Sequence, residues 1–117
     1  MRDFRKYDVW KLAHQFVLDI YGVSQNFPKT ETYGLTSQIR RASASVPTNF
    51  SEGCGRNTDN EFVRYIHIAL GSAHEVEYLL QLCFDLKFLD NEVYSELNTK
   101  INVIKKMLFS LEQKIKA

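Results

Sequence analysis

A run of apolar residues in the third quarter of the chain constrains the fold more than any other feature of the sequence. The residues recur in alternating steps of four and three, which places them on one face of an α-helix. They are Phe62, Ile66, Ala69, Ala73, Val76, Leu80 and Cys83. Leu79, Leu82 and Leu86 add a second apolar flank. The pattern predicts a long helix over residues 59–87 that is buried on two sides.

Three further segments carry apolar stripes of the same period, and they predict helices over residues 8–26, 33–53 and 91–116. All the connections are short, so consecutive helices should run antiparallel. We therefore expect an all-α protein, an antiparallel up-down-up-down four-helix bundle, with residues 1–117 forming a single domain.

Side chains at the helix ends support these boundaries. Asp8 is expected to be the N-cap of the first helix and Asp90 that of the fourth. Thr58 and Glu61 form a capping box ahead of the third helix. Within that helix Gly71 lies at a position where glycine costs about 1 kcal/mol relative to alanine. A close approach between helices is the expected compensation.

Composition limits the location and the class of partner. The net charge is +1, too small for a protein that coats nucleic acid through its overall charge. Cys54 and Cys83 lack a disulfide or zinc spacing and suit a reducing cytoplasm. No apolar run resembles a signal peptide or a membrane span, so we expect a soluble, cytoplasmic protein. No catalytic, cofactor-binding or metal-binding residues are predicted.

The stretch 33–56 has the least ordinary composition in the chain, YGLTSQIRRASASVPTNFSEGCGR. Pro47 lies inside the predicted helix, where a kink or a local loosening is expected. A polar stripe runs beside the apolar one. It indicates a polar network between helices or between subunits, formed by Gln38, Arg41, Asn49, Glu52 and Glu75. The alternative is a surface that binds nucleic acid.

That alternative requires several cations to converge in space, and an oligomeric ring would repeat each of them by symmetry. The candidates for contacts with phosphate groups are Lys6, Arg40, Arg41, Arg56 and Arg64. The sequence lacks the helix-turn-helix, zinc-finger and RNP motifs of known nucleic-acid-binding folds. A solvated surface remains the other interpretation of these charges.

The remaining candidates favour structural roles. His14, His67 and His74 lack the spacing of a metal site and are predicted to be surface residues. Cys54 lies between two glycines and could be an exposed thiol, although no histidine lies near it in the sequence. Among the aromatic residues, Trp10 and Tyr33 are the best candidates for an interface.

The stretch 33–56 resembles the signature of the 23S rRNA-intervening-sequence proteins, which are also described simply as four helix bundle proteins. Matching residues flank it: Asp8-Val9-Trp10, Phe27-Pro28 with Glu31, and the run 68–72 with Glu75. Leu70 departs from the family pattern, which has an arginine there. The resemblance implies small bacterial proteins that form ring-shaped pentamers. It extends to an accessory protein of diversity-generating retroelements, whose ring binds nucleic acid and a reverse transcriptase.

Together these features predict a non-enzymatic, homo-oligomeric binding or scaffold module without a cofactor. Its partners are expected to be copies of itself, in a pentamer, and RNA or DNA bound through a symmetry-repeated basic surface. The alternative is a scaffold for another protein with no role in nucleic-acid binding. An enzyme has little support, because the sequence shows no nucleophile–base pair, phosphate-binding loop or metal motif.

Overall fold

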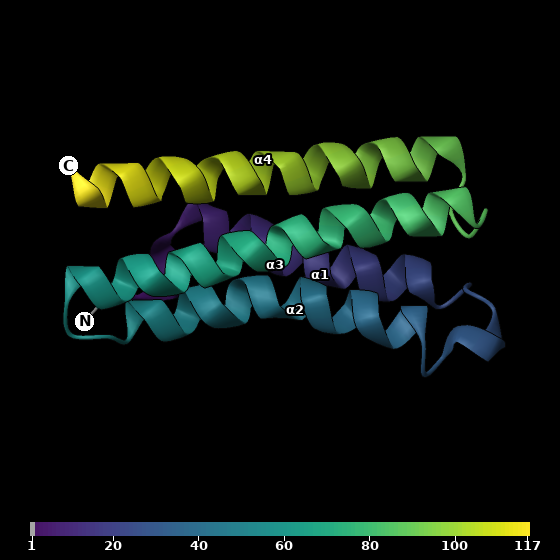
Figure 1. The fold of residues 1–117 in the computed structure, drawn as a ribbon, viewed down its shortest axis with the longest axis horizontal. Coiled ribbons are helices and arrows are strands. Elements are labelled where there is room, and N and C mark those ends of the chain that lie inside the picture. Colours follow the sequence, from purple (N-terminus) through teal and green to yellow (C-terminus); the bar gives the residue numbers. More distant parts are fainter. Residues whose placement is uncertain (1) are drawn as a thin grey trace.

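The computed structural model describes residues 2–117, and all regular structure in that range is helical. Figure 1 shows that the long helices lie side by side. They are α1 (Asp8–Ser24), α2 (Leu35–Cys54), α3 (Asp59–Asp85) and α4 (Asn91–Lys116), with short 3-10 helices η1 (Phe4–Lys6) and η2 (Lys29–Glu31). The predicted fold class is confirmed, and the predicted helix limits agree with these bounds to within two residues.

The order of packing is that of an antiparallel bundle. Helix α2 packs against α1 and α3, and α4 packs against α3 and more loosely against α1. The bundle is 43 Å long. The start of α1, the end of α4 and the turn between α2 and α3 lie at one end, and the α1–α2 and α3–α4 connections lie at the other (Figure 1). None of the helices in residues 2–117 is both long and apolar enough to cross a membrane.

The apolar stripe of α3 forms the centre of the core, because every residue of the predicted alternating run is buried. The second flank of α3 is different. Leu79 is buried, Leu82 is half-buried and Leu86 is 49% exposed. The prediction that α3 is buried on two sides is therefore confirmed for the alternating run. Of the second flank, Leu82 is partly exposed and Leu86 largely exposed in the single chain.

Polar side chains at two helix starts satisfy free backbone N–H groups. The Thr58 hydroxyl accepts a hydrogen bond from the backbone N–H of Glu61, and the Asp90 carboxylate accepts one from Val93 at 2.8 Å. Both caps are confirmed, although no hydrogen bond from the Thr58 N–H to the Glu61 carboxylate completes the predicted capping box within residues 2–117. The prediction for Asp8 is wrong, because Asp8 is the first helical residue of α1 and Tyr7 precedes it without a side-chain cap.

Helix α2 continues without a break through Pro47, from Leu35 to Cys54. Proline leaves the carbonyl one turn earlier, that of Ser43, without its usual donor. The Ser43 hydroxyl is itself buried and has no hydrogen-bond partner among residues 2–117. Pro47 thus changes the hydrogen bonding of the buried side of α2 without ending the helix.

Close packing of α2 on α3 depends on Gly53. A Cβ atom at this position would lie 2.7 Å from Tyr65 Cβ and 3.1 Å from Phe62 Cδ1. Real Cβ atoms do not approach a neighbouring Cβ so closely, so any larger side chain would push the two helices apart. Gly53 therefore sets the distance between α2 and α3 near their common turn.

We expect Gly53→Ala to lower the free energy of unfolding by about 1–3 kcal/mol, because overpacking outweighs the helix propensity of alanine. Urea denaturation followed by circular dichroism measures this change. Gly22→Ala in α1 is the matched control, since a Cβ there meets nothing within 4 Å. It should raise stability by up to about 1 kcal/mol. Equal effects of the two variants would contradict the close packing at Gly53.

Candidate binding surface

The five residues of the predicted polar network lie along α2 and α3, and most of them are exposed in the single chain. Gln38, Arg41, Glu52 and Glu75 are exposed, and Asn49 is half-buried. Asn49 donates to the backbone carbonyl of its own helix one turn earlier, at 2.8 Å. No hydrogen bond or ion pair joins any two of the five within residues 2–117. A network between subunits remains a prediction.

A different polar contact joins α2 to α3. The hydroxyl oxygens of Ser45 and Ser72 lie 2.8 Å apart, and the Asn49 amide donates to Ser45 Oγ at 2.9 Å. These hydrogen bonds connect the two stretches that carry the family resemblance, the central motif of α2 and the Gly71-Ser72 pair of α3. The sequence pattern marks both stretches as unusual, but it does not predict that Ser45 and Ser72 meet.

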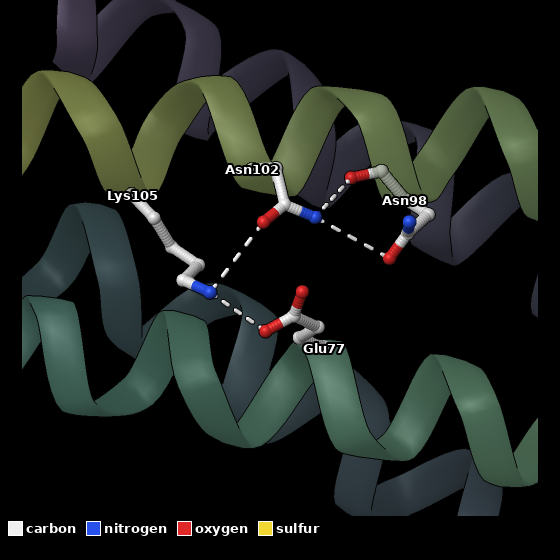
Figure 2. Close-up of polar contacts among 4 residues, drawn as sticks. All are labelled: Glu77, Asn98, Asn102 and Lys105. Atoms are coloured by element: carbon white, nitrogen blue, oxygen red, sulfur yellow. Dashed lines mark hydrogen bonds and ion pairs between the residues drawn. The ribbon is translucent and has the colours of Figure 1, made fainter.

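The shortest polar contact between α3 and α4 has no counterpart among the sequence predictions. Figure 2 shows Lys105 of α4 reaching across to Glu77 of α3, with Asn102 and Asn98 beside them. Lys105 Nζ donates to Glu77 Oε1 at 2.7 Å, and Asn102 Nδ2 donates to the backbone carbonyl of Asn98 at 2.8 Å. The hydrogen bond from Lys105 is the main reason that the pKa of Glu77 lies below its ordinary value.

Two more polar pairs join the helices. Lys100 of α4 binds Asp19 of α1 at 2.9 Å, and this hydrogen bond is the main cause that raises the pKa of Lys100. His67 of α3 lies 3.0 Å from the buried carboxylate of Glu112 in α4. At these positions the polar side chains of facing helices therefore bind each other within the bundle.

The two arginines at the start of the polar stripe have different environments. Arg40 donates through Nε to the Ser24 hydroxyl at 2.8 Å, and its guanidinium lies over the ring of Tyr21. Arg40 thus fastens α2 to α1. Arg41, next to it, is exposed and has no ion pair within residues 2–117.

The other predicted cations gather near the turn between α2 and α3. Arg56 and Arg64 both lie against the ring of Tyr65, at 4.8 and 5.7 Å from its centroid. Lys6, in η1, is exposed, and η1 packs against α2. Along α2, Arg40 and Arg41 are about 20 Å from this end at 1.5 Å per residue. The single chain therefore divides the five candidate cations into two groups.

The division follows a charge difference between the two halves of the bundle. The half with the α2–α3 turn, residues 2–16, 45–72 and 104–117, has ten Lys and Arg against six Asp and Glu. The other half, residues 17–44 and 73–103, has five against eight. We call the first half the basic half and the second the acidic half. The net charge of the protein is therefore near zero although the basic half carries +4 and the acidic half −3.

An open groove of about 650 Å³ lies along the outer side of α2, mostly in the acidic half, and extends as far as Asn49 in the basic half. Tyr21 and Tyr33 border it, and Tyr33 is 97% exposed. Arg40, Arg41 and small polar residues of α2 line the rest. Trp10, the other predicted interface residue, is half-buried and stacks on His14 with ring centroids 5.1 Å apart.

The thiols are unsuited to nucleophilic chemistry. Cys54 and Cys83 are both buried, and burial raises their pKa values to about 11 and about 12. Both are therefore protonated thiols at neutral pH, and the exposed thiol considered at Cys54 is wrong. The three histidines are exposed, as predicted. Within residues 2–117 there is no group of three His, Cys, Asp or Glu residues that could hold a metal ion.

The fold and these surfaces define a class, that of small four-helix bundles whose polar residues lie on open helix faces rather than in an enclosed pocket. The family model of the 23S rRNA-intervening sequence protein matches residues 5–110. The chain belongs to this family, which confirms the resemblance seen in the sequence.

A solved structure supports the same assignment. The chain is 25% identical to a protein of unknown function from the S23 ribosomal protein family of Bacteroides thetaiotaomicron. The match has a TM-score of 0.83 and covers 89% of this chain and 97% of that one. The comparison with curated proteins gave no match.

The Glu77–Lys105 pair makes stability depend on pH. Because the fold lowers the pKa of Glu77, the pair contributes fully above the ordinary value of 4.5 and is lost as the pH falls through the lower folded value. Glu77→Gln should cost about 0.5–1 kcal/mol at pH 7 and much less at pH 3. Urea denaturation at both pH values measures this difference. Glu52→Gln is the control, and a pH-independent destabilisation in Glu77→Gln would contradict the ionic role.

Proposed function

We propose that this protein is a non-enzymatic, homo-oligomeric binding module of the cytoplasm that contacts the phosphates of RNA or DNA through its basic half. The observation that carries the proposal is the separation of charge along the bundle, ten cations against six anions in one half. A polyanion approaching the protein is attracted to that half and repelled by the other.

Free cations make the attraction effective, since a lysine or arginine held by a carboxylate in its own chain has little to offer a phosphate. Three cations of the basic half are held in such pairs by Asp3, Asp8 and Asp59, and Lys105 is held by Glu77. Six others have no ion pair within residues 2–117. They are Lys6, Arg56, Arg64, Lys106, Lys114 and Lys116.

Assembly would multiply this charge. In a cyclic oligomer whose bundles lie parallel to the symmetry axis, every basic half faces the same rim. In a pentamer, the assembly that the family resemblance implies, five copies of a half that carries +4 would share that rim. The affinity would then come from many weak phosphate contacts, without the base contacts that give sequence specificity.

A protein scaffold without a role in nucleic-acid binding is the second candidate. The observation that favours it is Tyr33, which is 97% exposed beside the groove on α2. An exposed aromatic ring at the edge of a groove is typical of protein interfaces. Tyr33→Ala should abolish capture of such a partner from a native lysate and leave nucleic-acid binding unchanged.

Binding to a duplex DNA of about 30 base pairs and to an RNA of the same sequence, followed by fluorescence anisotropy across salt concentrations, tests the proposal. The triple variant Lys6→Ala, Arg56→Ala, Arg64→Ala should bind more weakly at every sequence tested. The magnitude of its salt slope on DNA should fall by about 0.9 for each phosphate that the variant no longer neutralises.

The matched control removes three cations from the acidic half, Lys29, Arg41 and Lys87, each by substitution with Ala. This variant has the same net charge and should keep most of the affinity. Equal weakening in both variants would contradict the assignment of binding to the basic half. Absence of binding by the wild-type protein at low salt would exclude the nucleic-acid function.

A further inference from the structure

Gly71 lacks the intramolecular reason that the sequence predicts for it. The prediction is close packing against another helix, but a Cβ at Gly71 would meet nothing within 4 Å. That prediction is wrong for the single chain. Gly71 lies in the middle of α3 and is exposed, where alanine would make a more stable helix. Within residues 2–117, no other part of the chain packs against Gly71, the one glycine of α3.

The surroundings of Gly71 have the character of an interface. Ile68 and Tyr78 lie on the same outer side of α3, at steps of three and seven residues, and are 40% and 63% exposed. Leu82, one further turn along, is half-buried. Glu75 lies in the centre of this surface and has no ion pair within residues 2–117. We call this surface, from Ile68 to Leu82, the outer face of α3.

The negative charge of Glu75 limits the kind of partner that can bind the outer face of α3. A nucleic acid would meet a carboxylate at the centre of the contact. Two copies joined through the same face with their α3 helices parallel, by a two-fold axis along the bundle, would place Glu75 against its own symmetry mate. Both arrangements are electrostatically unfavourable. A surface that carries a cation and exposed apolar groups, and that differs from the outer face of α3, avoids both.

The groove between α1 and α4 meets these requirements. Leu12 of α1 and Val103 of α4 border an apolar cavity of about 250 Å³ there, and they are 44% and 43% exposed. Lys106, which has no ion pair within residues 2–117, lines the continuation of the groove toward the basic half. The pair Glu77–Lys105 shows that Lys106 and Glu75 lie at a similar level along the bundle.

We propose that a second copy of this chain docks here: the outer face of α3 of one copy packs into the α1–α4 groove of the next, with Glu75 against Lys106. In the assembly this pair removes Lys106 from the free cations of the basic half and leaves Lys6, Arg56, Arg64, Lys114 and Lys116 to contact phosphates. The proposal rests on the homo-oligomer proposed above and names the contact that builds it. Two different faces of one chain form a heterologous contact, which closes into a ring when the rotation allows. In a ring whose bundles lie parallel to the symmetry axis, Lys106 stays level with the Glu75 of its neighbour.

Glycine substitutions separate this role from an effect on folding. Gly71→Ala should raise the midpoint of urea unfolding of the dissociated chain and yet weaken assembly. Gly71→Leu should reduce the mass in light scattering to that of one chain, 13.6 kDa. Thr48→Leu is the control, because Thr48 is an exposed residue of α2 that lies on neither of the two docking surfaces. It should leave the mass of the assembly unchanged.

A charge exchange tests the predicted partner of Glu75. Glu75→Lys and Lys106→Glu should each weaken assembly by about tenfold or more, because each places like charges together. The double variant should restore it, and the control Glu92→Lys should have no effect. Failure of the double variant to recover the assembly would overturn the pairing of Glu75 with Lys106.

The results of these experiments distinguish two hypotheses: that the protein is a homo-oligomer, and that the outer face of α3 forms its contact. A wild-type oligomer that tolerates Gly71→Leu overturns the α3 contact and leaves the proposed assembly standing. A wild-type protein that scatters light as a single chain at micromolar concentration contradicts both. Circular dichroism of every variant establishes whether a lower mass reflects dissociation of folded chains.

Discussion

The close contact between α2 and α3 is the constraint on which the rest of the structure depends. Near their common turn the two helices are so close that Gly53 of α2 packs directly against Tyr65 and Phe62 of α3. Halfway along the bundle the hydroxyls of Ser45 and Ser72 face each other at 2.8 Å. Because both contacts use small residues, the helices stay close over this length, and α1 and α4 can pack on the paired surface that they form.

The fold was predictable from the sequence because it depends on periodicity, and every apolar residue of the alternating run in α3 is buried. The surface was less predictable, because periodicity says which side of a helix is polar but not which polar side chains meet. Glu77 and Lys105 are 28 residues apart and belong to no local motif. Gly71 shows the same limit, since its position in the sequence indicates a close approach within the chain that the folded chain does not make.

The signature residues of α2 therefore fall into two groups. Ser45, Asn49 and Gly53 contribute to contacts inside the chain. Arg41 and Glu52 contribute to no ion pair among the described residues. A family signature that combines both groups is consistent with a chain that must first fold and then meet a partner. The groups are interleaved along one helix, so sequence alone could not separate them.

The uneven distribution of charge along the 43 Å bundle also gives the molecule a permanent electric dipole moment along its length. In the field of a long, negatively charged molecule such a particle experiences a torque as well as a force, and it turns its positive end forward before contact. The rotation acts only within about one Debye length, about 8 Å at physiological ionic strength. The protein would then become oriented only in the last step of the encounter. Added salt would slow association because it screens the electrostatic torque that orients the protein.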